Sequence, residues 1–361
     1  NINAMNTYRI ATVPGDGIGK EVIPESVKVL NLVAAKCGFQ LKYKNYDYSC
    51  EHFKKYGKMM PEDGLERLRD SDGIFLGAVG YPGVPDHVSL WGLLVPIRRG
   101  FQQYVNLRPV RLLKGVESPL KNPGSIDFYI VRENNEGEYS SIGGRFNEGT
   151  EHELAVQESI FTRRGVDRVM KYAFELAKKR DKKLTSATKS NGIIHTMPYW
   201  DERFKAMSAK YPNVSTEQFH IDILAAHFVQ FPDRFDVVVA SNLFGDILSD
   251  LGPAVVGGMG IAPGANINPE KEFPSMFEPV HGSAPDIAGK KLANPIACIW
   301  TAAMMLDHLG ESEGAKLMVN AIEKITAKGE ILTRDLGGEA NTQEVTQAII
   351  EQIKKRNPVN Q

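Results

Sequence analysis

Short apolar runs alternate with longer segments of helical periodicity along most of the chain. The apolar runs that predict strands span 8–14, 73–79, 127–133, 183–189 and 235–241. Apolar residues recur at helical spacing in 20–36, 166–180, 198–211 and 343–355. Such alternation predicts an α/β protein in which parallel strands are covered by helices. Segment 140–160 carries glycines in a pattern typical of a hairpin, so we expect an antiparallel pair there.

Composition and charge are those of an ordinary globular protein. Of 361 residues, 42% are apolar and 24% are charged, and this length suggests two domains. The formal net charge of −1 gives no electrostatic reason to expect nucleic acid or an anionic membrane as a partner. The longest apolar runs are shorter than a membrane span, and no secretory signal is visible. Three cysteines without metal-ligand spacing fit a reduced compartment, so we predict a cytoplasmic protein.

Two aspartates stand in the otherwise apolar sequence NLFGDILSDLGP at 242–253. A helix would place Asp246 and Asp250 on one face, with their Cβ atoms about 5–6 Å apart. Like charges at this spacing repel each other and weaken the helix. Two solvated acids are the plain alternative, but the neighbouring Ile247, Leu248 and Leu251 fit it poorly. The repulsion therefore calls for a compensating group.

A glycine-rich sequence, PGDGIGKE at 14–21, joins the first predicted strand to the first predicted helix. It lacks the Ser or Thr that follows GxxxxGK in a P-loop, and it fits the GxGxxG pattern of dinucleotide-binding folds poorly. We interpret it as a tight strand-to-helix turn.

Three arginines are candidates for binding an anion. Arg98 and Arg108 lie close together in the sequence, and Arg132 ends an apolar strand before an Asn-rich turn. A solvated surface residue is the simplest interpretation of any one arginine, but ligands of α/β sheets bind at strand ends. Several guanidinium groups converging there would suit a small polyanion, since each can donate two hydrogen bonds to a carboxylate.

Tyr139, Lys189 and Asp222 also lie at the ends of predicted elements. An exposed lysine is the default, but a lysine near other cations can have a lowered pKa and act as a base. Asp222 opens an apolar stretch, where it is as plausibly a helix N-cap as a functional carboxylate. One side chain can serve as both.

The chain resembles the β-decarboxylating dehydrogenases, the isocitrate/isopropylmalate dehydrogenase family, from about residue 8 to its C-terminal helix. The stretches that carry the resemblance are PGDGIGKE, LWGLLVPIRR, VNLRPVR, VRENNEGEYS, ATKSNGI, HIDIL, NLFGDILSDLGP and EPVHGSAPDIAGKKLANP. The resemblance implies an isopropylmalate-dehydrogenase-like α/β fold with two domains around a parallel or mixed sheet. Residues 1–103 plus 260–361 would bind the cofactor. Residues 104–259 would form an inserted domain for substrate, metal and dimerisation.

The same resemblance implies a role for each matched residue. Substrate carboxylates would bind Arg98, Arg108 and Arg132, and Mg²⁺ or Mn²⁺ would bind Asp222, Asp246 and Asp250, with K⁺ as a candidate activator. Lys189 would take the hydroxyl proton before hydride transfer, and Tyr139 would protonate the enolate left after loss of CO₂. In the family, the counterparts of Lys189 and Asp222 reach across from a second subunit, which implies a homodimer with shared active sites.

The cofactor implied by the resemblance is NAD. His281, Gly282, Ser283 and Ala284 match the family's adenosine and phosphate loop, and Asn294 matches its adenine contact. Asp286 would accept hydrogen bonds from the ribose 2′-hydroxyl and repel a 2′-phosphate. NADP-using relatives tend to carry Lys and Tyr where this chain has Asp286 and Ile287.

Departures from better-known members point to the substrate, a small (2R)-hydroxy diacid. Isocitrate enzymes place Ser and Asn where this chain has Gly92 and Leu94, and isopropylmalate enzymes place a Glu where it has Leu90. The stretches DHVSLWGLL, GEYSSIGGR and FTRRGVDR instead resemble the tartrate and D-malate dehydrogenase branch, and the bulky Trp91 would suit a C4 diacid. We therefore predict oxidative decarboxylation of D-malate to pyruvate and CO₂, with L-tartrate and meso-tartrate as related substrates.

Three alternatives stay open. 3-Isopropylmalate is the rival substrate. A dehydrogenase without decarboxylation is disfavoured by the three arginines, which would hold the carboxylate that is lost. A non-catalytic metal- and nucleotide-binding relative would be favoured by loss of Lys189 or Tyr139, and both are present.

Overall fold

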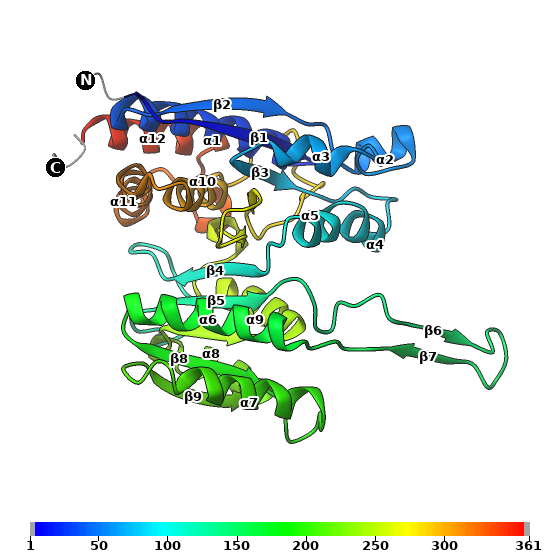
Figure 1. Cartoon of the computed structure of the whole chain (residues 1–361). Helices are drawn as coiled ribbons and strands as arrows, with labels where there is room; N and C mark the ends of the chain where they lie inside the picture. Colours follow the sequence, from blue (N-terminus) through cyan, green and yellow to red (C-terminus); the bar gives the residue numbers. More distant parts are fainter. Residues whose placement is uncertain (1–3, 357–361) are drawn as a thin grey trace.

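The structure is a computed structural model that describes residues 4–356. Its centre is one ten-stranded sheet with the order β2-β1-β3-β12-β11-β4-β5-β10-β8-β9 (Figure 1). The strands are β1 (Thr7–Gly15), β2 (Gln40–Asn45), β3 (Gly73–Ala78), β4 (Val105–Arg111), β5 (Asp127–Glu133), β8 (Lys183–Thr188), β9 (Ser215–His220), β10 (Val237–Ala240), β11 (Ala265–Ile267) and β12 (Ser275–Phe277). A separate antiparallel pair, β6 (Gly143–Phe146) and β7 (Leu154–Gln157), projects from the body as an arm.

Helices cover the sheet. They are α1 (Gly19–Cys37), α2 (Cys50–Tyr56), α3 (Gly64–Arg69), α4 (Asp86–Ser89), α5 (Val95–Gly100), α6 (Arg163–Lys179), α7 (Thr196–Ser208), α8 (Ile221–Gln230), α9 (Asn242–Val255), α10 (Ile296–His308), α11 (Ser312–Lys328) and α12 (Thr342–Lys354). A short π-helix, η1 (Leu90–Leu94), lies between α4 and α5. The five predicted strands, the four predicted helices and the predicted hairpin are all confirmed, with ends shifted by a few residues.

The sheet is mixed rather than wholly parallel. Strand β4 pairs antiparallel with both β5 and β11, and β11 pairs antiparallel with β12. The other neighbouring strands of the ten are parallel, such as β1 with β3 and β10 with β8. The predicted parallel or mixed sheet is therefore confirmed, and β4 and β11, which bring in the antiparallel pairs, were not among the predicted strands.

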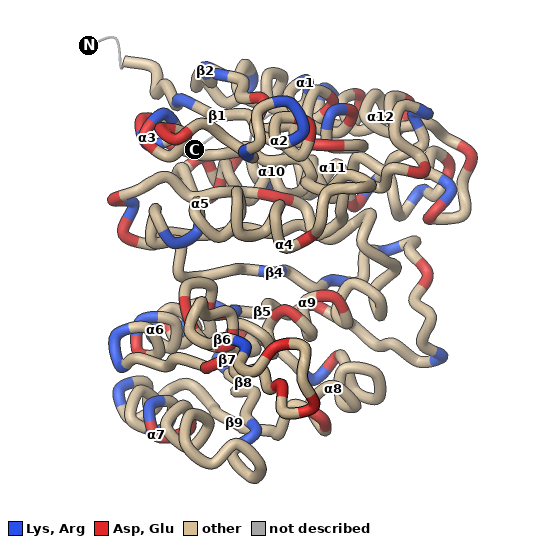
Figure 2. The backbone as a smooth tube through the Cα atoms, turned by 90° about the vertical axis from the view of Figure 1, so that its right-hand side faces the viewer, with Lys and Arg blue, Asp and Glu red and all other residues tan. Residues whose placement is uncertain are grey.

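The strand order separates two ends of the sheet. Strands from the first 103 residues, together with β11 and β12, lie at one end, and β4, β5, β10, β8 and β9 lie at the other (Figure 1). We retain a cofactor domain of 1–103 plus 260–361 and an inserted domain of 104–259 as a proposal. Basic and acidic residues are interspersed over the elements at both ends of the sheet (Figure 2).

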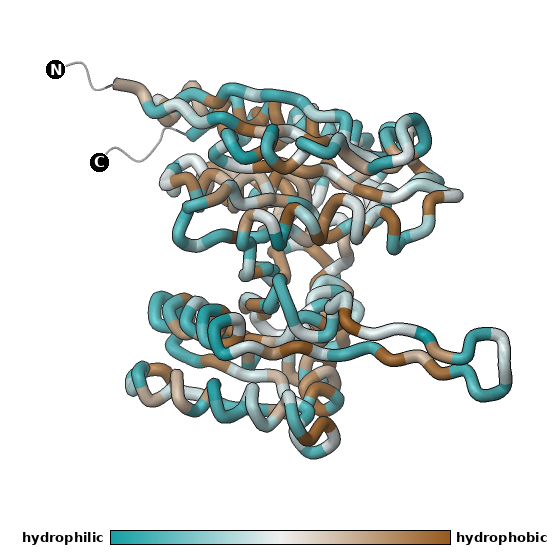
Figure 3. Tube along the Cα trace, turned by 45° about the vertical axis from the view of Figure 1, so that its right-hand side comes forward, coloured by the Kyte–Doolittle hydropathy of each residue, from teal (hydrophilic) through white to brown (hydrophobic). Residues whose placement is uncertain are grey.

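Burial follows the hydrophobic pattern. Hydrophobic positions run along the strands and the inner faces of the helices, whereas the outer faces are largely hydrophilic (Figure 3). Helix α6 is a clear case, because Val166, Val169, Met170, Ala173 and Phe174 are buried while its lysines and arginines face outward or lie at its edges. The arm is different, since both of its strands are exposed along their whole length.

The turn after β1 is the tight one predicted from PGDGIGKE. Gly17 has φ +54°, and a Cβ there would lie 2.1 Å from the carbonyl oxygen of Ser283. The next residue, Ile18, donates its backbone N–H to that same oxygen at 2.8 Å. The turn is therefore packed directly against the loop that contains Ser283, and glycine is needed for this approach.

Candidate active site

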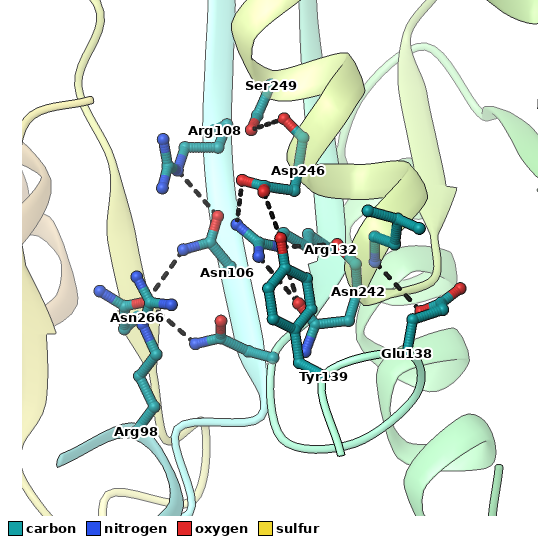
Figure 4. Close-up of polar contacts among 12 residues, drawn as sticks. Arg98, Asn106, Arg108, Arg132, Glu138, Tyr139, Asn242, Asp246, Ser249 and Asn266 are labelled. Atoms are coloured by element: carbon teal, nitrogen blue, oxygen red, sulfur yellow. Dashed lines mark hydrogen bonds and ion pairs between the residues drawn. The ribbon is translucent and has the colours of Figure 1, made fainter. Parts of the chain in front are cut away.

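Arg132, Asp246 and Tyr139 form the centre of the candidate site (Figure 4). Arg132, at the end of β5, is 4% exposed, and its Nη1 donates to Asp246 Oδ1 at 3.0 Å. The Tyr139 hydroxyl donates to the other oxygen, Asp246 Oδ2, at 2.5 Å. Asp246 is thus held by one charged and one neutral donor, and Arg132 supplies a compensating charge that the sequence did not identify.

Asn242, one turn before Asp246 on α9, fixes the rest of the Arg132 guanidinium. Its side-chain oxygen accepts from Arg132 Nε at 3.1 Å and from Nη2 at 2.8 Å. Gly245 allows this close approach, since a Cβ there would lie 2.4 Å from Cγ of Arg132. Helix α9 is therefore locked onto β5 at the position where its first aspartate meets the strand end.

The two aspartates of α9 differ in their surroundings. Burial raises the pKa of Asp246, but the charge of Arg132 and the hydrogen bond from Tyr139 outweigh burial, so its pKa lies below the ordinary value. Burial and the charge of Asp246 raise the pKa of Asp250, despite Arg108 and Arg132 nearby. Arg132 therefore relieves only one member of the pair. The remaining repulsion falls on Asp250, which favours a cation bound between the two.

The two other predicted arginines lie beside this centre and are buried. Arg98 Nη2 pairs with Glu278 Oε1 at 3.0 Å, and Arg98 Nε is buried without a hydrogen-bond partner. Arg108 Nε donates to the Asn106 side chain at 2.8 Å. Burial and the neighbouring charge of Arg132 lower the pKa of Arg108 to about 10. The structure thus brings the three arginines together, as predicted: Arg98 and Arg132 are paired with Glu278 and Asp246, and Arg108, among the described residues, has a side-chain hydrogen bond to Asn106 alone.

A network of amides supports the arginines. Asn266 donates to Glu278 at 3.0 Å and accepts from Asn106 and Asn134, each at 2.9 Å. Sequence reasoning missed these side chains, together with Asn242 and Glu278. For all of them except Asn266 the signal was their position within the quoted motifs, because Asn106 precedes Arg108 by two residues and Asn242 precedes Asp246 by one helical turn.

Tyr139 retains its proton in this environment. Burial, the hydrogen bond to Asp246 and that carboxylate's charge raise the pKa of Tyr139 to about 12. Its backbone carbonyl accepts a hydrogen bond from Arg99, whose guanidinium carbon lies 5.0 Å from the centre of the Trp91 ring. Tyr139 is therefore a protonated donor that is held at its hydroxyl and at its backbone.

Lys189 and Asp222 lie apart from this centre and pair with each other. Lys189 Nζ donates to Asp222 Oδ1 at 3.0 Å, and the Asp222 side chain is 69% exposed. The hydrogen bond from Lys189 lowers the pKa of Asp222. Asp222 is not the N-cap of α8, because that residue is His220 and Asp222 lies in the first turn. Within residues 4–356, no three carboxylate, His or Cys side chains come close enough together to hold a metal ion.

The predicted cofactor residues form a loop against the first turn of α1. Glu21 accepts backbone N–H bonds from Gly289 and Lys291, each at 3.0 Å. His281 Nε2 is buried without a hydrogen-bond partner, and burial lowers the pKa of His281. Asp286 is exposed, and Asn294 donates to Asp335 at 3.0 Å. Gly282, Ser283, Ala284 and Ile287 complete the loop.

Comparisons with known proteins identify the family of this chain. The profile described as "Isocitrate/isopropylmalate dehydrogenase" matches residues 9–352. The chain belongs to this family, and it is an oxidative decarboxylating dehydrogenase. The predicted family, the α/β fold and the class of enzyme are confirmed.

Two relatives and one solved structure show which members of the family this chain is similar to. The chain is 61% identical to the D-malate dehydrogenase [decarboxylating] of Escherichia coli K12 over 96% of this chain and 98% of that one. It is 57% identical to the tartrate dehydrogenase/decarboxylase of Pseudomonas putida over 97% and 99%. The crystal structure of isocitrate dehydrogenase from Methylococcus capsulatus matches with a TM-score of 0.86 at 32% identity, over 96% and 99%. Among residues 4–356, helices that could cross a membrane are absent.

Proposed function

We propose that this chain is a cytoplasmic enzyme that oxidises D-malate with NAD and a divalent metal ion, releasing pyruvate and CO₂. L-Tartrate and meso-tartrate are its related substrates. The observation that carries the proposal is the buried cradle of Arg98, Arg108 and Arg132 beside the Tyr139–Asp246 hydrogen bond. D-Malate is preferred because relatives at 61% and 57% identity are named for D-malate and tartrate.

The cradle would bind the carboxylate at C4 of the substrate, which is the one lost as CO₂. Guanidinium groups in a buried site make strong, directional hydrogen bonds to a carboxylate. Arg98 still has a buried Nε without a partner, and Arg108 makes one side-chain hydrogen bond, to Asn106. Both arginines therefore have donors left for a diacid.

The paired aspartates fit a hard divalent cation. Members of the family generally use a divalent metal and NAD. Asp246 and Asp250 offer carboxylate oxygens one turn apart, and the residual repulsion on Asp250 would be relieved by Mg²⁺ or Mn²⁺. Asp222 from a second subunit would add a third carboxylate. A metal bound there supplies Lewis acidity at the substrate hydroxyl and at the developing enolate.

Lys189 and Tyr139 would move the protons. Lys189, also from a second subunit, would accept the hydroxyl proton as hydride leaves C2 for the nicotinamide. Tyr139 would return a proton to C3 after CO₂ is lost, and its pKa of about 12 keeps it protonated until then. The adenosine end of NAD would lie against the 281–294 loop, where Asp286 would select NAD over NADP.

The homodimer that this mechanism requires has a candidate surface on α8 and α9, which contact each other. Large apolar side chains are exposed there, namely Ile223, Val229, Leu243 and Ile247. The arm exposes Ile142, Phe146, Leu154 and Val156 as well. Exposed apolar groups gathered on neighbouring elements are typical of a protein interface. Lys189 and Asp222 lie next to this surface, at the ends of β8 and α8.

One assay tests the proposal. NADH formation is measured with Mn²⁺ on D-malate, L-tartrate, meso-tartrate and 3-isopropylmalate. The highest kcat/KM is expected for D-malate. A higher kcat/KM for 3-isopropylmalate would transfer the proposal to that substrate, and no NADH from any of the acids would favour the non-catalytic alternative.

A further inference from the structure

Glu138, the residue before Tyr139, ties the tyrosine's loop to the start of α9. Glu138 lies beside the start of α9, near Asn242 and Tyr139 (Figure 4). Its Oε1 accepts from the Ser241 hydroxyl at 2.6 Å, and its Oε2 accepts from the backbone N–H of Leu243 at 3.1 Å. Ser241 is the N-cap of α9, yet its side chain accepts no N–H of its own helix. A carboxylate from a separate segment therefore supplies the cap that α9 would otherwise lack.

The position of α9 itself does not depend on Glu138. Asn242 binds Arg132 of β5 through its side-chain oxygen and donates from Nδ2 to the carbonyl of Glu136 at 3.0 Å. Asp246 binds Arg132 as well, at 3.0 Å. Loss of the Glu138 carboxylate would thus leave the aspartates in place, whereas the segment that carries Tyr139 would lose one of its ties to the helix and keep those of Glu136 and of the Tyr139 hydroxyl.

Tyr139 needs that tie because its hydroxyl has one partner at a fixed place, Asp246 Oδ2 at 2.5 Å. After Tyr139, Ser140 bonds to residues of the β7 strand and its end, which belong to the exposed arm and not to the body. Before Glu138, Gly137 pairs with Ile160. Arg99 holds the Tyr139 carbonyl and Asn242 holds the Glu136 carbonyl, and Glu138 adds the contact that fixes the residue next to Tyr139 to the helix bearing Asp246.

We infer that Glu138 is a positioning residue that holds the Tyr139 hydroxyl in register with Asp246 and with the carbon to be protonated. The inference rests on the proposed function, because it assumes that Tyr139 delivers the proton. Misplacing a catalytic group by about 1 Å can cost up to 10²-fold in rate. Since other contacts also restrain the loop, we expect Glu138→Ala to slow the Tyr139-dependent step about tenfold.

The chain contains a matched control two residues away. Glu136 binds the N-terminus of α6 in a related way, because it accepts from the backbone N–H of Thr162 at 2.9 Å and from the Thr162 hydroxyl at 2.8 Å, while Thr162 itself caps α6. Gly137, with φ +84°, turns the chain between the two glutamates. Both side chains bind a helix N-terminus from outside, but only Glu138 binds that of the helix that carries Asp246.

The test is a double-mutant cycle between Glu138 and Tyr139. Mn²⁺-dependent conversion of oxaloacetate to pyruvate without NADH, which includes protonation at C3, is measured for the wild type, Glu138→Ala, Tyr139→Phe and the double variant, after subtracting the rate of Mn²⁺ alone. Glu138→Ala should lose about tenfold when Tyr139 is present and no more than about twofold when it is combined with Tyr139→Phe, since coupled residues are not additive. Glu136→Ala should stay within about twofold of the wild type.

An equal loss with and without Tyr139, or no loss from Glu138→Ala alone, would overturn the inference. So would a loss from Glu136→Ala as large as that from Glu138→Ala. If Glu138→Ala does not fold, Glu138→Gln keeps the side-chain volume and one acceptor oxygen, and the same cycle is run with it. Failure of the proposed function is visible separately, in a wild type that neither reduces NAD with D-malate nor decarboxylates oxaloacetate above the Mn²⁺ rate.

Discussion

Two groups of residues stabilise a carboxylate charge in opposite ways. One is the buried cluster of Arg132, Asp246 and Tyr139, and the other is the exposed pair of Lys189 and Asp222. Asp246 is held by a guanidinium that is 4% exposed and by a phenol. Asp222 has one lysine partner at 3.0 Å and is 69% exposed. One cluster is complete within a single chain. The other presents its charges to solvent, as a contribution to a neighbour's site would require.

Burial within a cluster also decides how the two aspartates of α9 respond when their charge is removed. Asp246→Asn removes a proposed metal ligand, but it also removes the ion-pair partner of the buried Arg132, so we expect lower stability as well as lower activity. Asp250→Asn removes a proposed ligand whose charge is repelled by Asp246. We therefore expect Asp250→Asn to abolish Mn²⁺ activation while the free energy of unfolding is unchanged or higher.

The largest expected effect is the loss of turnover in these two variants, about 10³-fold for each, because a bound metal contributes several kcal/mol to stabilising charge in the transition state. Steady-state NADH formation is measured over a Mn²⁺ titration, and urea unfolding is measured alongside. Full wild-type activity after exhaustive metal removal would refute a metal mechanism. Equal free energies of unfolding for Asp246→Asn and Asp250→Asn would refute the proposed difference between these two aspartates.

Next in size are the effects of substituting Lys189 and Tyr139, the two residues proposed to transfer protons. Each should contribute about 10²–10⁴-fold to overall turnover, but to different steps. Lys189→Met should slow hydride transfer and largely retain the conversion of oxaloacetate to pyruvate. Tyr139→Phe should lose that conversion and largely retain NADH formation in the first turnover. Rapid-mixing NADH measurements and the oxaloacetate assay separate the steps. The opposite pattern would mean that the two roles are exchanged.

A smaller but more direct signal comes from mixing inactive variants. If Lys189 serves the partner's site, a heterodimer of Lys189→Met and Tyr139→Phe has one intact site and one site with both defects. About half of the dimers formed from an equal mixture are heterodimers, so about a quarter of wild-type activity should return after subunit exchange. Tyr139→Phe mixed with Asp250→Asn is the control, because both residues belong to the same chain's half of the site and no recovery is expected.

The sequence was informative where a motif fixes both residue type and local geometry. The aspartates four apart on α9, Arg132 at the end of β5 and the hairpin at 140–160 all follow from local periodicity and spacing. It was uninformative about contacts that form only in three dimensions. Nothing local indicates that Arg132, 114 positions before Asp246, neutralises it, or that β4 runs antiparallel to β5. Single buried amides such as Asn266 carry no periodic signal at all.

The smallest expected effect concerns stability around the buried cluster, and it arises at Glu133, the residue after Arg132. Burial raises the pKa of Glu133 to about 7, although the backbone N–H groups of Glu136 and Asn135 oppose the shift. An ordinary Glu in the unfolded chain has a pKa of about 4.3. The folded state therefore binds the proton more tightly, so this contribution to stability is full below about pH 4.3 and declines as the pH rises through about 7.

Glu133→Gln cannot titrate, so it should remove that part of the pH dependence. The free energy of unfolding of the variant minus that of the wild type should increase between about pH 5 and pH 8, as measured by urea unfolding at each pH. The same comparison for Asp222→Asn, at the exposed pair, should show almost no change over this range, because solvent screens that pair and its carboxylate is ionised throughout. A difference for Glu133→Gln that is flat or falls with pH would show that Glu133 is already ionised in the folded protein.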